Sequence, residues 1–422
     1  MKFFFPDSQD FVDPSFDFET EERSVSRTRH RDDEYAHEVF ASPPFDGMLV
    51  SKSMVDGFAE TGSRYSIAQR HRLLRVGAPD FFRVPSASPF PIMGDCGAFT
   101  YVREPEPPYS VEEVLQFYID CRFDFGISVD HVILEYAEEL DHLLPGIGAT
   151  EKLRARQEIT LDRARKFLDL HRKERPPFEP LGVAQGWSPV SYADSVRCLQ
   201  AMGYTYIAVG GLVPLKTRDI LACLREIDSV RRPETRLHLL GVTRTDQVES
   251  FESYGVVSFD STSPLRQAFK DDRDNYYTLD RTYTAIRIPQ VEGNPRLQRS
   301  IRAGQVAHDA ARWLEQECLA TFKAFDSGAA PMEHLLERLH QYEELYDPGA
   351  DRRKVYRETL EAAPWKDCPC EVCRALGYHV VLFRGAERNR RRGFHNLWVF
   401  YRRLHRELGL ADEVASRSAV AF

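Results

Sequence analysis

Short hydrophobic segments that end in glycine or a polar residue recur along the first two thirds of the chain. Their length and their aliphatic content are typical of buried strands, and several of the gaps between them have the period of an amphipathic helix, as at 111–121, 153–172 and 191–202. Repeated alternation of strand and helix predicts an α/β protein built as a parallel TIM (β/α)8 barrel. The expected strands are 48–50, 91–93, 127–129, 181–184, 206–209, 237–240 and 256–259.

Polar residues or glycines stand at the ends of most of these expected strands. The carboxyl ends of parallel barrel strands meet on one face, where such barrels hold their active sites. Any one of these residues alone is better explained as opening a loop or capping the next helix. Their equivalent positions together predict a shared site made of Asp95, Asp130, Gln185, Gly210, Gly211 and Asp260.

A cysteine cluster near the C-terminus indicates a metal site. Of the eight cysteines in the chain, Cys368, Cys370 and Cys373 fall together, and His395 follows them. Three thiolates and a neutral imidazole complete a closed tetrahedral zinc site, which stabilises structure and leaves no position for catalytic water. His379 is the alternative fourth ligand, and a redox cluster or coincidence is the alternative to zinc.

Changes in composition and pattern divide the chain into segments. Residues 1–40 are highly charged with little periodicity and form an N-terminal extension, and residues 41–293 hold the main part of the barrel. Residues 294–363 form an added helical segment, clearest at 307–325 and 332–346. Residues 364–422 contain the zinc-binding subdomain and a C-terminal helix that completes the barrel and that we expect from Leu397 to about Leu408.

Composition narrows the class of protein. The hydrophobic content of 42% and the aromatic content of 12% suffice for a large core, and a net charge of −9 argues against a general nucleic-acid coat protein while allowing a local basic surface. No apolar run approaches membrane-spanning length, and the N-terminal residues are not those of a signal peptide. Scattered cysteines beside a thiolate metal site fit a reducing compartment, so we expect a cytoplasmic protein.

The motifs together resemble those of the tRNA-guanine transglycosylase family. They occur in the family's order across roughly residues 45 to 410, and the resemblance implies a TIM barrel with a zinc subdomain inserted near its end. The cysteine cluster followed by His395-Asn396-Leu397 is similar to the family's metal signature. The other matching segments are 94–99, similar to an Asp-Ser-Gly-Gly-aromatic motif, 124–130, 183–186, Gly210-Gly211-Leu212, and Phe259-Asp260 with 264–268.

Several positions depart from the tRNA-modifying pattern. The family's Thr-Arg-Asn-Ala-Arg, which helps to grip the tRNA anticodon loop, is replaced by Leu265-Arg266-Gln267-Ala268-Phe269, and its Ser-Gly after the general-base aspartate is replaced by Cys96-Gly97. Residues 1–40 and 294–363 have no counterpart in the compact bacterial tRNA enzymes. These departures resemble the branch that inserts 7-deazaguanine derivatives into DNA, beside DNA-modification and restriction systems.

The resemblance implies a pentosyltransferase that replaces guanine in DNA with 7-cyano-7-deazaguanine or a close derivative. Asp260 would attack the nucleoside to form a covalent glycosyl-aspartate, and Asp95 would carry the proton between the leaving and incoming bases. Asp130 would accept hydrogen bonds from the base, and Gln185 and the Gly211 N–H would donate to it. Gly210 and Leu212 complete the substrate-binding signature, in which glycine admits the flat base.

A run of arginines near the metal cluster is the expected contact with the nucleic-acid backbone. Such a run is often only a solvated helix face, but a base flipped out of its stack costs a few kcal/mol that phosphate contacts must offset. Arg266, close after Asp260, is a further candidate. The run consists of Arg384, Arg388, Arg390, Arg391 and Arg392, with Arg402 and Arg403 beyond it.

Two alternatives stay open at the level of the sequence. One is a tRNA-guanine transglycosylase that acts on tRNA in queuosine- or archaeosine-type modification. The other is a non-catalytic, zinc-stapled nucleic-acid binding module, against which the pair Asp95 and Asp260 argues, because binding an anion does not require two carboxylates. The chain has no glycine-rich ATP-binding loop, so a helper ATPase or nuclease is a plausible partner, and a dimer is possible.

Overall fold

A closed ring of eight parallel strands forms the core of the first of two compact units in the computed structural model, which describes residues 1–57, 63–87, 89–142, 148–270 and 273–410. This barrel unit comprises Met1–Gln9, Phe45–Thr262 and the chain from Leu404, and Asp10–Pro44 with Ser263–Arg403 forms a helical unit. The strands are β1 (Lys2–Pro6), β2 (Gly47–Ser51), β3 (Ile92–Asp95), β4 (Phe125–Ile127), β5 (Glu179–Ala184), β6 (Tyr206–Val209), β7 (Arg236–Leu239) and β8 (Val256–Asp260).

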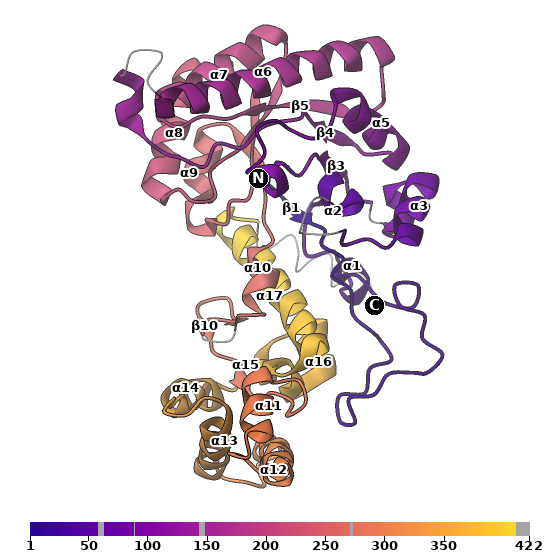
Figure 1. The fold of residues 1–422 in the computed structure, drawn as a ribbon, viewed down its shortest axis with the longest axis vertical. Coiled ribbons are helices and arrows are strands. Elements are labelled where there is room, and N and C mark those ends of the chain that lie inside the picture. The colour runs from indigo at the N-terminus through magenta and orange to yellow at the C-terminus, as the bar shows by residue number, and fades with distance from the viewer. Residues whose placement is uncertain (58–62, 88, 143–147, 271–272, 411–422) are drawn as a thin grey trace. The chain divides into compact units, whose positions relative to one another are not determined.

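Helices separate most of these strands in sequence, which confirms the predicted (β/α) barrel (Figure 1). Side chains from around the ring fill its interior, including Phe4, Leu49, Met93, Ile127 and Val183, so the barrel is a packed core without a pore. The helices of the unit are α2 (Lys52–Asp56), α3 (Ile67–Val76), α4 (Ala78–Phe81), α5 (Val111–Cys121), α6 (Gly148–Glu174), α7 (Pro189–Met202), α8 (Thr217–Val230) and α9 (Val248–Ser253).

The first strand departs from the predicted N-terminal extension. Lys2–Pro6 forms β1, in which Phe4 pairs with Gly47 of β2 and with Asp260 of β8, and so closes the ring. A continuous hydrophobic run is the pattern of a strand buried on both faces. The barrel therefore begins at residue 2, and all its strands lie before residue 261.

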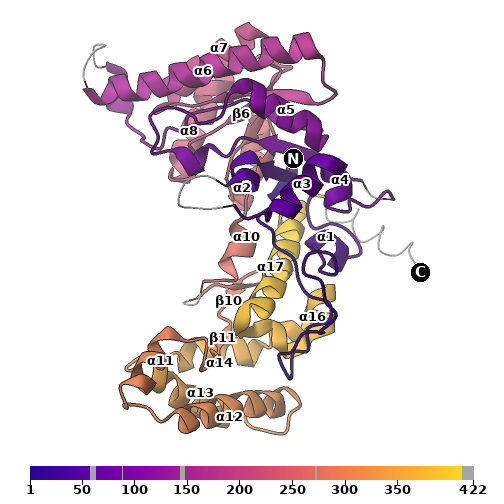
Figure 2. The same cartoon turned by 45° about the vertical axis from the view of Figure 1, so that its right-hand side comes forward.

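The helical unit contains two short two-stranded sheets and a layer of helices. Strands β9 (Tyr276–Tyr277) and β10 (Thr282–Tyr283) pair with each other, and β11 (Ile286–Arg287) pairs with β12 (Leu382–Phe383). The contacting helices α12, α13 and α14 form the added layer that the sequence predicted (Figure 2). The helices of the unit are α1 (Ala36–Val39), α10 (Ser263–Gln267), α11 (Pro295–Arg302), α12 (His308–Asp326), α13 (Met332–Tyr346), α14 (Arg353–Ala362), α15 (Pro364–Asp367), α16 (Glu371–Leu376) and α17 (Gly385–Glu407).

The last helix is longer than the sequence indicated. Helix α17 begins at Gly385, so it includes His395, which precedes the expected start at Leu397. The segment 10–44 packs along this helix through buried polar contacts. The Glu387 carboxylate accepts a hydrogen bond from the backbone N–H of Asp13, and the Glu21 carboxylate pairs with Arg384 at 2.7 Å. Residues from both ends of the chain thus build one unit.

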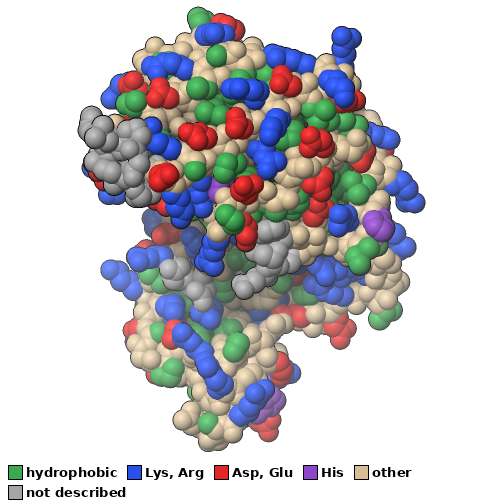
Figure 3. Space-filling model, turned by 45° about the horizontal axis from the view of Figure 1, so that its top comes forward, with side chains coloured by type: hydrophobic (Ala, Val, Ile, Leu, Met, Phe, Trp, Pro, Cys, Tyr) green, Lys and Arg blue, Asp and Glu red, His purple; other side chains and the backbone are tan. Residues whose placement is uncertain are grey.

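The surface carries charges of both signs. Figure 3 shows Lys and Arg side chains interspersed with Asp and Glu on the face in view, as expected for a chain of net charge −9. Among the described residues, no helix is long and apolar enough to cross a membrane.

Candidate active site and metal centre

Asp260 lies at the carboxyl end of β8 and is almost fully buried. Two groups contact the same oxygen of its carboxylate. The backbone N–H of Gly241 donates to Oδ1 at 3.0 Å, and the imidazole Nε2 of His238 lies 3.3 Å from Oδ1. Within the described chain, no hydrogen bond reaches Oδ2, so one oxygen is held and the other is available.

Asp95 occupies the corresponding position at the end of β3 and is held in the same way. Its Oδ2 accepts hydrogen bonds from the Ser51 hydroxyl at 2.7 Å and from the Gly97 N–H at 2.9 Å. Burial raises the pKa of Asp95 to about 6, and the negative charge of Asp260 adds to the shift, against the opposing effect of the Ser51 hydrogen bond. A carboxyl group of this pKa can both donate and accept a proton near neutral pH.

Asp130 and Gln185 form the inner wall of this site. Gln185 Nε2 donates to Asp130 Oδ2 at 2.7 Å, and the Cys96 thiol lies 3.2 Å from Asp130 Oδ1. Both Asp130 and Gln185 are buried, at 2% and 0% exposure. Burial raises the pKa of Asp130 to about 7, and the charge of Asp95 raises it further. The charge of Asp260 acts on Asp95 and the charge of Asp95 acts on Asp130, so the three predicted carboxylates lie close together.

The two glycines after β6 let the backbone lie against Gln185. A Cβ on Gly210 would stand 2.2 Å from Gln185 Nε2, and a Cβ on Gly211 would stand 2.4 Å from the Ile133 carbonyl oxygen. Gly211 also has a positive φ of 76°, which side chains other than glycine rarely adopt. The N–H of Gly211 donates to no group in the described chain. Leu212 follows with its side chain buried at 1% exposure.

The predicted metal ligands come together in the helical unit. The ligand atoms of Cys368, Cys370, Cys373 and His395 all lie within 4.8 Å of one another. His395 Nδ1 stands 3.6, 3.4 and 3.3 Å from the three sulfurs in that order. A tetrahedral zinc with Zn–S of about 2.3 Å and Zn–N of about 2.0 Å has S···N edges of about 3.5 Å. The cluster can therefore hold a metal ion and is compatible with zinc.

The surroundings of His395 fix the nitrogen that faces the sulfurs. Its Nε2 lies 2.7 Å from the carbonyl oxygen of Tyr277, which can only accept, so Nε2 carries the proton and Nδ1 keeps its lone pair. The ring of Tyr276 stacks on the imidazole with 4.2 Å between ring centroids, and its hydroxyl lies 3.2 Å from Cys373 Sγ. His379, the alternative ligand, is not part of the cluster.

The arginine run departs from its predicted role, because most of its members lie in the interior. Arg384 and Arg388 both bond the Glu21 carboxylate. Arg391 Nη2 donates to the carbonyl oxygen of Asp13 at 2.9 Å. The buried members of the run are Arg384, Arg388, Arg391 and Arg392.

Arg392 is fully buried and bonds backbone carbonyl groups. Its guanidinium donates to the Leu382 carbonyl oxygen at 2.9 Å and to the Ala268 carbonyl oxygen at 2.6 Å. A phosphate would have to displace these contacts and those of Arg388 and Arg391, so the structure places these three side chains as supports of the helical unit. Arg266, on α10, is exposed and Arg390 is partly exposed, and both remain candidates for phosphate contact.

Three supporting residues were not singled out from the sequence. Ser51 and His238 contact the carboxylates of Asp95 and Asp260, and the Tyr101 hydroxyl donates to Cys96 Sγ at 3.0 Å. The only available signal was a polar residue in an otherwise hydrophobic strand, as at His238. The partners of Ser51 and His238 follow from strand register, which the sequence does not show.

The arrangement defines a class of enzyme. Two carboxylates at strand ends suit an enzyme that transfers a glycosyl group, and the separate Cys3His cluster is compatible with a structural metal. No family model matches the chain. A curated relative, the DNA-guanine transglycosylase of Salmonella montevideo, is 48% identical over 417 residues, which cover 98% of this chain and 99% of the relative. The chain therefore belongs to the DNA-guanine transglycosylase family and is a glycosyl-transferring enzyme.

Proposed function

We propose that this protein replaces guanine in DNA with 7-cyano-7-deazaguanine or a close derivative, through a covalent glycosyl-enzyme intermediate on Asp260. The observation that carries the mechanism is the pair of carboxylates at the ends of β8 and β3, Asp260 and Asp95, each of which is held through one oxygen by two neighbouring groups. Support for DNA as the substrate comes from the near full-length relative named for it and from the altered tRNA-gripping segment at 265–269.

The first half of the reaction breaks the bond between guanine and C1′ of the deoxyribose. Oδ2 of Asp260 attacks C1′ and forms a C–O bond, while guanine leaves with the electron pair of the C1′–N9 bond. Asp95 donates a proton to the departing base. The raised pKa of Asp95, about 6, lets a fraction of the enzyme hold that proton at neutral pH.

The second half reverses these steps with the new base. Asp95, now ionised, takes the N9 proton of the incoming deazaguanine, whose N9 attacks C1′ and displaces Asp260. Two displacements at one carbon retain the configuration of the nucleoside, the same logic as in retaining glycosidases. The sugar therefore returns to the same stereochemistry with a different base.

Base selection is assigned to the inner wall. Ionised Asp130 accepts hydrogen bonds from the ring N–H and the amino group of a guanine-like base, and the Gly211 N–H and the second amide hydrogen of Gln185 donate to its carbonyl oxygen. The substituent at position 7 of the base takes part in none of these hydrogen bonds. Both the outgoing guanine and the incoming deazaguanine can thus use the same contacts.

We propose zinc as the metal of the Cys3His cluster and phosphate binding for Arg266 and Arg390. Bound zinc would join α17 to the segment 368–373 and stabilise the helical unit, with no part in the chemistry. A helper ATPase or nuclease belongs to the same proposal, since extruding a base from duplex DNA costs a few kcal/mol.

The test is incorporation of labelled 7-cyano-7-deazaguanine into plasmid DNA and, in parallel, into bulk tRNA. We expect label in DNA, none in tRNA, and none with Asp260→Ala. Asp194→Ala, on the exposed surface of α7, is the matched control and should retain full incorporation. Label in tRNA alone would favour the tRNA-modifying alternative, and incorporation by Asp260→Ala would refute the covalent mechanism.

A further inference from the structure

A line of buried polar side chains runs through the barrel to the proposed nucleophile. Tyr206 on β6 hydrogen-bonds through its hydroxyl to the Ser258 hydroxyl on β8. The Ser258 hydroxyl lies 2.7 Å from Nδ1 of His238 on β7, and His238 Nε2 lies 3.3 Å from Asp260 Oδ1. We refer to Tyr206, Ser258 and His238 as the axial chain.

The positions of the protons in the axial chain follow from Asp260, the group at which it ends. An ionised Asp260 can only accept, so His238 must carry its proton on Nε2 and donate it to Oδ1. Nδ1 then has a lone pair and accepts the Ser258 O–H, which leaves the Ser258 oxygen to accept the Tyr206 O–H. Every donor in the axial chain therefore points toward Asp260, and a single neutral tautomer of His238 satisfies all three contacts.

The surroundings of the axial chain are hydrophobic. His238 is 0% exposed, and the ring of Phe4 packs edge-on against its imidazole. Tyr206 belongs to the hydrophobic cluster that fills the barrel. Polar groups buried in such a core cost free energy unless they are hydrogen-bonded, and a hydrophobic residue at position 238 would fill the same space at lower cost. Stability therefore does not explain why the axial chain is polar, and a functional role is the better explanation.

Strand register brings the histidine to its place. The pairing of β7 with β8 shifts between Leu237 and His238, so that Leu237 lies opposite Val256 and His238 lies opposite Ser258. Such irregularities re-aim side chains and are frequent beside active sites. The shift places His238 between Ser258 and Asp260.

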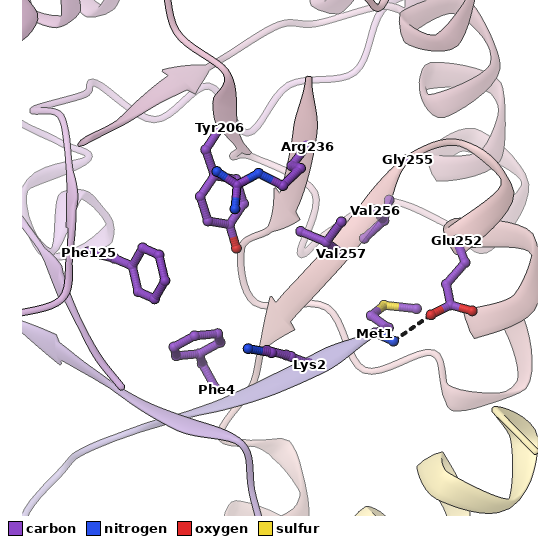
Figure 4. A pocket seen from close by; sticks show the side chains of 10 residues that line it. All are labelled: Met1, Lys2, Phe4, Phe125, Tyr206, Arg236, Glu252, Gly255, Val256 and Val257. Carbon is purple, nitrogen blue, oxygen red and sulfur yellow. Dashed lines mark hydrogen bonds and ion pairs between the residues drawn. The ribbon is translucent and has the colours of Figure 1, made fainter. Parts of the chain in front are cut away.

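The end of the axial chain that is farther from Asp260 is Tyr206, which lies at the amino ends of the barrel strands. There, Tyr206 lines a cavity of about 420 Å³ (Figure 4), and the Arg236 guanidinium stands 4.5 Å from the centre of its ring. Arg236 also pairs with Glu179 of β5. These contacts hold the Tyr206 ring, the first donor of the axial chain, from the opposite end of the barrel.

We propose that His238 is a positioning residue for the transferase reaction, which holds Oδ1 of Asp260 together with the Gly241 N–H and so turns Oδ2 toward C1′. The inference rests on the proposed function, because it assumes that Asp260 is the nucleophile. Two donors on one oxygen fix the plane of the carboxylate. Without the imidazole, the Gly241 N–H alone leaves the carboxylate free to rotate.

The test compares His238→Leu with His238→Gln in the full-length enzyme. Leucine removes the donor, whereas the amide of glutamine reaches the position of Nε2 and can donate to Oδ1. We measure the single-turnover rate of guanine release from plasmid DNA, the dissociation constant of free guanine and the thermal midpoint. His238→Leu should slow release by about 10²-fold, the cost of a misplacement near 1 Å, with guanine affinity within twofold of the wild type. His238→Gln should recover most of the rate.

Three outcomes would overturn the inference or its basis. Release by His238→Leu at the wild-type rate, with Asp260→Asn inactive, would refute the positioning role alone. Equal losses of rate and of guanine affinity in both His238 variants would show a merely structural residue. Activity of Asp260→Asn would instead refute the proposed function itself. If His238→Leu does not fold, Ser258→Ala serves in its place and should slow guanine release by about tenfold. Without the Ser258 hydroxyl, the His238 proton is no longer kept on Nε2, where it can be donated to Asp260.

Discussion

Gln185 donates its amide hydrogen to Asp130 at 2.7 Å, and neither side chain has access to bulk solvent. The amide therefore aligns the carboxylate before any base arrives, and burial raises the pKa of Asp130 to about 7. An acceptor for two base N–H groups must be ionised. In the proposed reaction, the base would therefore be recognised by a group whose charge changes near neutral pH.

The affinity for a guanine-like base should fall as the pH falls. Asp130 accepts only when deprotonated, and a group with pKa 7 is ionised in about nine tenths of molecules at pH 8 and in one tenth at pH 6. The dissociation constant of guanine should therefore rise about tenfold between pH 8 and pH 6, measured by calorimetry. Asp130→Asn should bind weakly without this pH dependence. A pH-independent constant for the wild type would contradict the assigned role of Asp130.

Asp95→Asn should separate proton transfer from nucleophilic attack. The pKa of Asp95 is raised to about 6, so the protonated form needed for guanine release is lost as the pH rises through 6. Single-turnover release by the wild type should decline by up to tenfold per pH unit above pH 6, when chemistry limits the rate. Asp95→Asn should be slower by about 10²- to 10⁴-fold and show no such decline. An unchanged profile in the variant would assign the titration to another group.

Loss of the metal should destabilise the helical unit and leave the barrel residues in place. Cys373→Ser removes one ligand, and structural zinc commonly contributes on the order of 10 kcal/mol to folding. We expect one equivalent of zinc in the wild type, little in the variant, and a separate unfolding transition at lower temperature by calorimetry. Cys198→Ser, at an exposed cysteine of α7, is the matched control and should change neither.

Glu21→Ala should destabilise the packing of the segment 10–44 on α17. The pKa of Glu21 is about 2, because the hydrogen bond and charge of Arg384 outweigh the opposing effect of burial. Removal of the carboxylate leaves Arg384 and Arg388 buried with one fewer anion, at a cost of about 3–5 kcal/mol in urea unfolding. Glu22→Ala, at the exposed neighbour, should cost little.

The acid dependence of this contact has a defined sign. A carboxyl group whose pKa is lower in the folded protein contributes stability above its ordinary value of 4.5, and that contribution is lost as the pH falls toward 2. The stability difference between the wild type and Glu21→Gln should therefore shrink over this interval. A constant difference would show that the contact does not depend on the charge of Glu21.

Local pattern was sufficient for most of the barrel and for placing Asp95 and Asp260 at strand ends. The strands that end at Asp95 and Asp260 are hydrophobic runs followed by an aspartate, and this pattern can be recognised from neighbouring residues alone. The first strand was missed because Phe3-Phe4-Phe5 is short and is followed by proline and a charged stretch. Periodicity cannot assign so short a run without its partners.

Long-range partners explain the remaining differences. The charge of Arg388 alone suggests that its side chain faces solvent. In the structure it pairs with Glu21, which is far away in sequence. Likewise, His238 is only a polar residue in a strand until the register of β7 and β8 brings it to Asp260. Side chains whose role is set by another strand or segment cannot be assigned from spacing alone.

The helical unit is drawn from two stretches of chain, 10–44 and 263–403, that flank most of the barrel in sequence. During synthesis, the first stretch emerges long before Arg384 or Glu387 exists to receive it. Closure of the loop between them costs entropy before any contact compensates, so this packing should be a late and slow step of folding. Until the last helix leaves the ribosome, the polar groups of residues 10–44 remain exposed, and the protein depends on completing its chain before this unit can form.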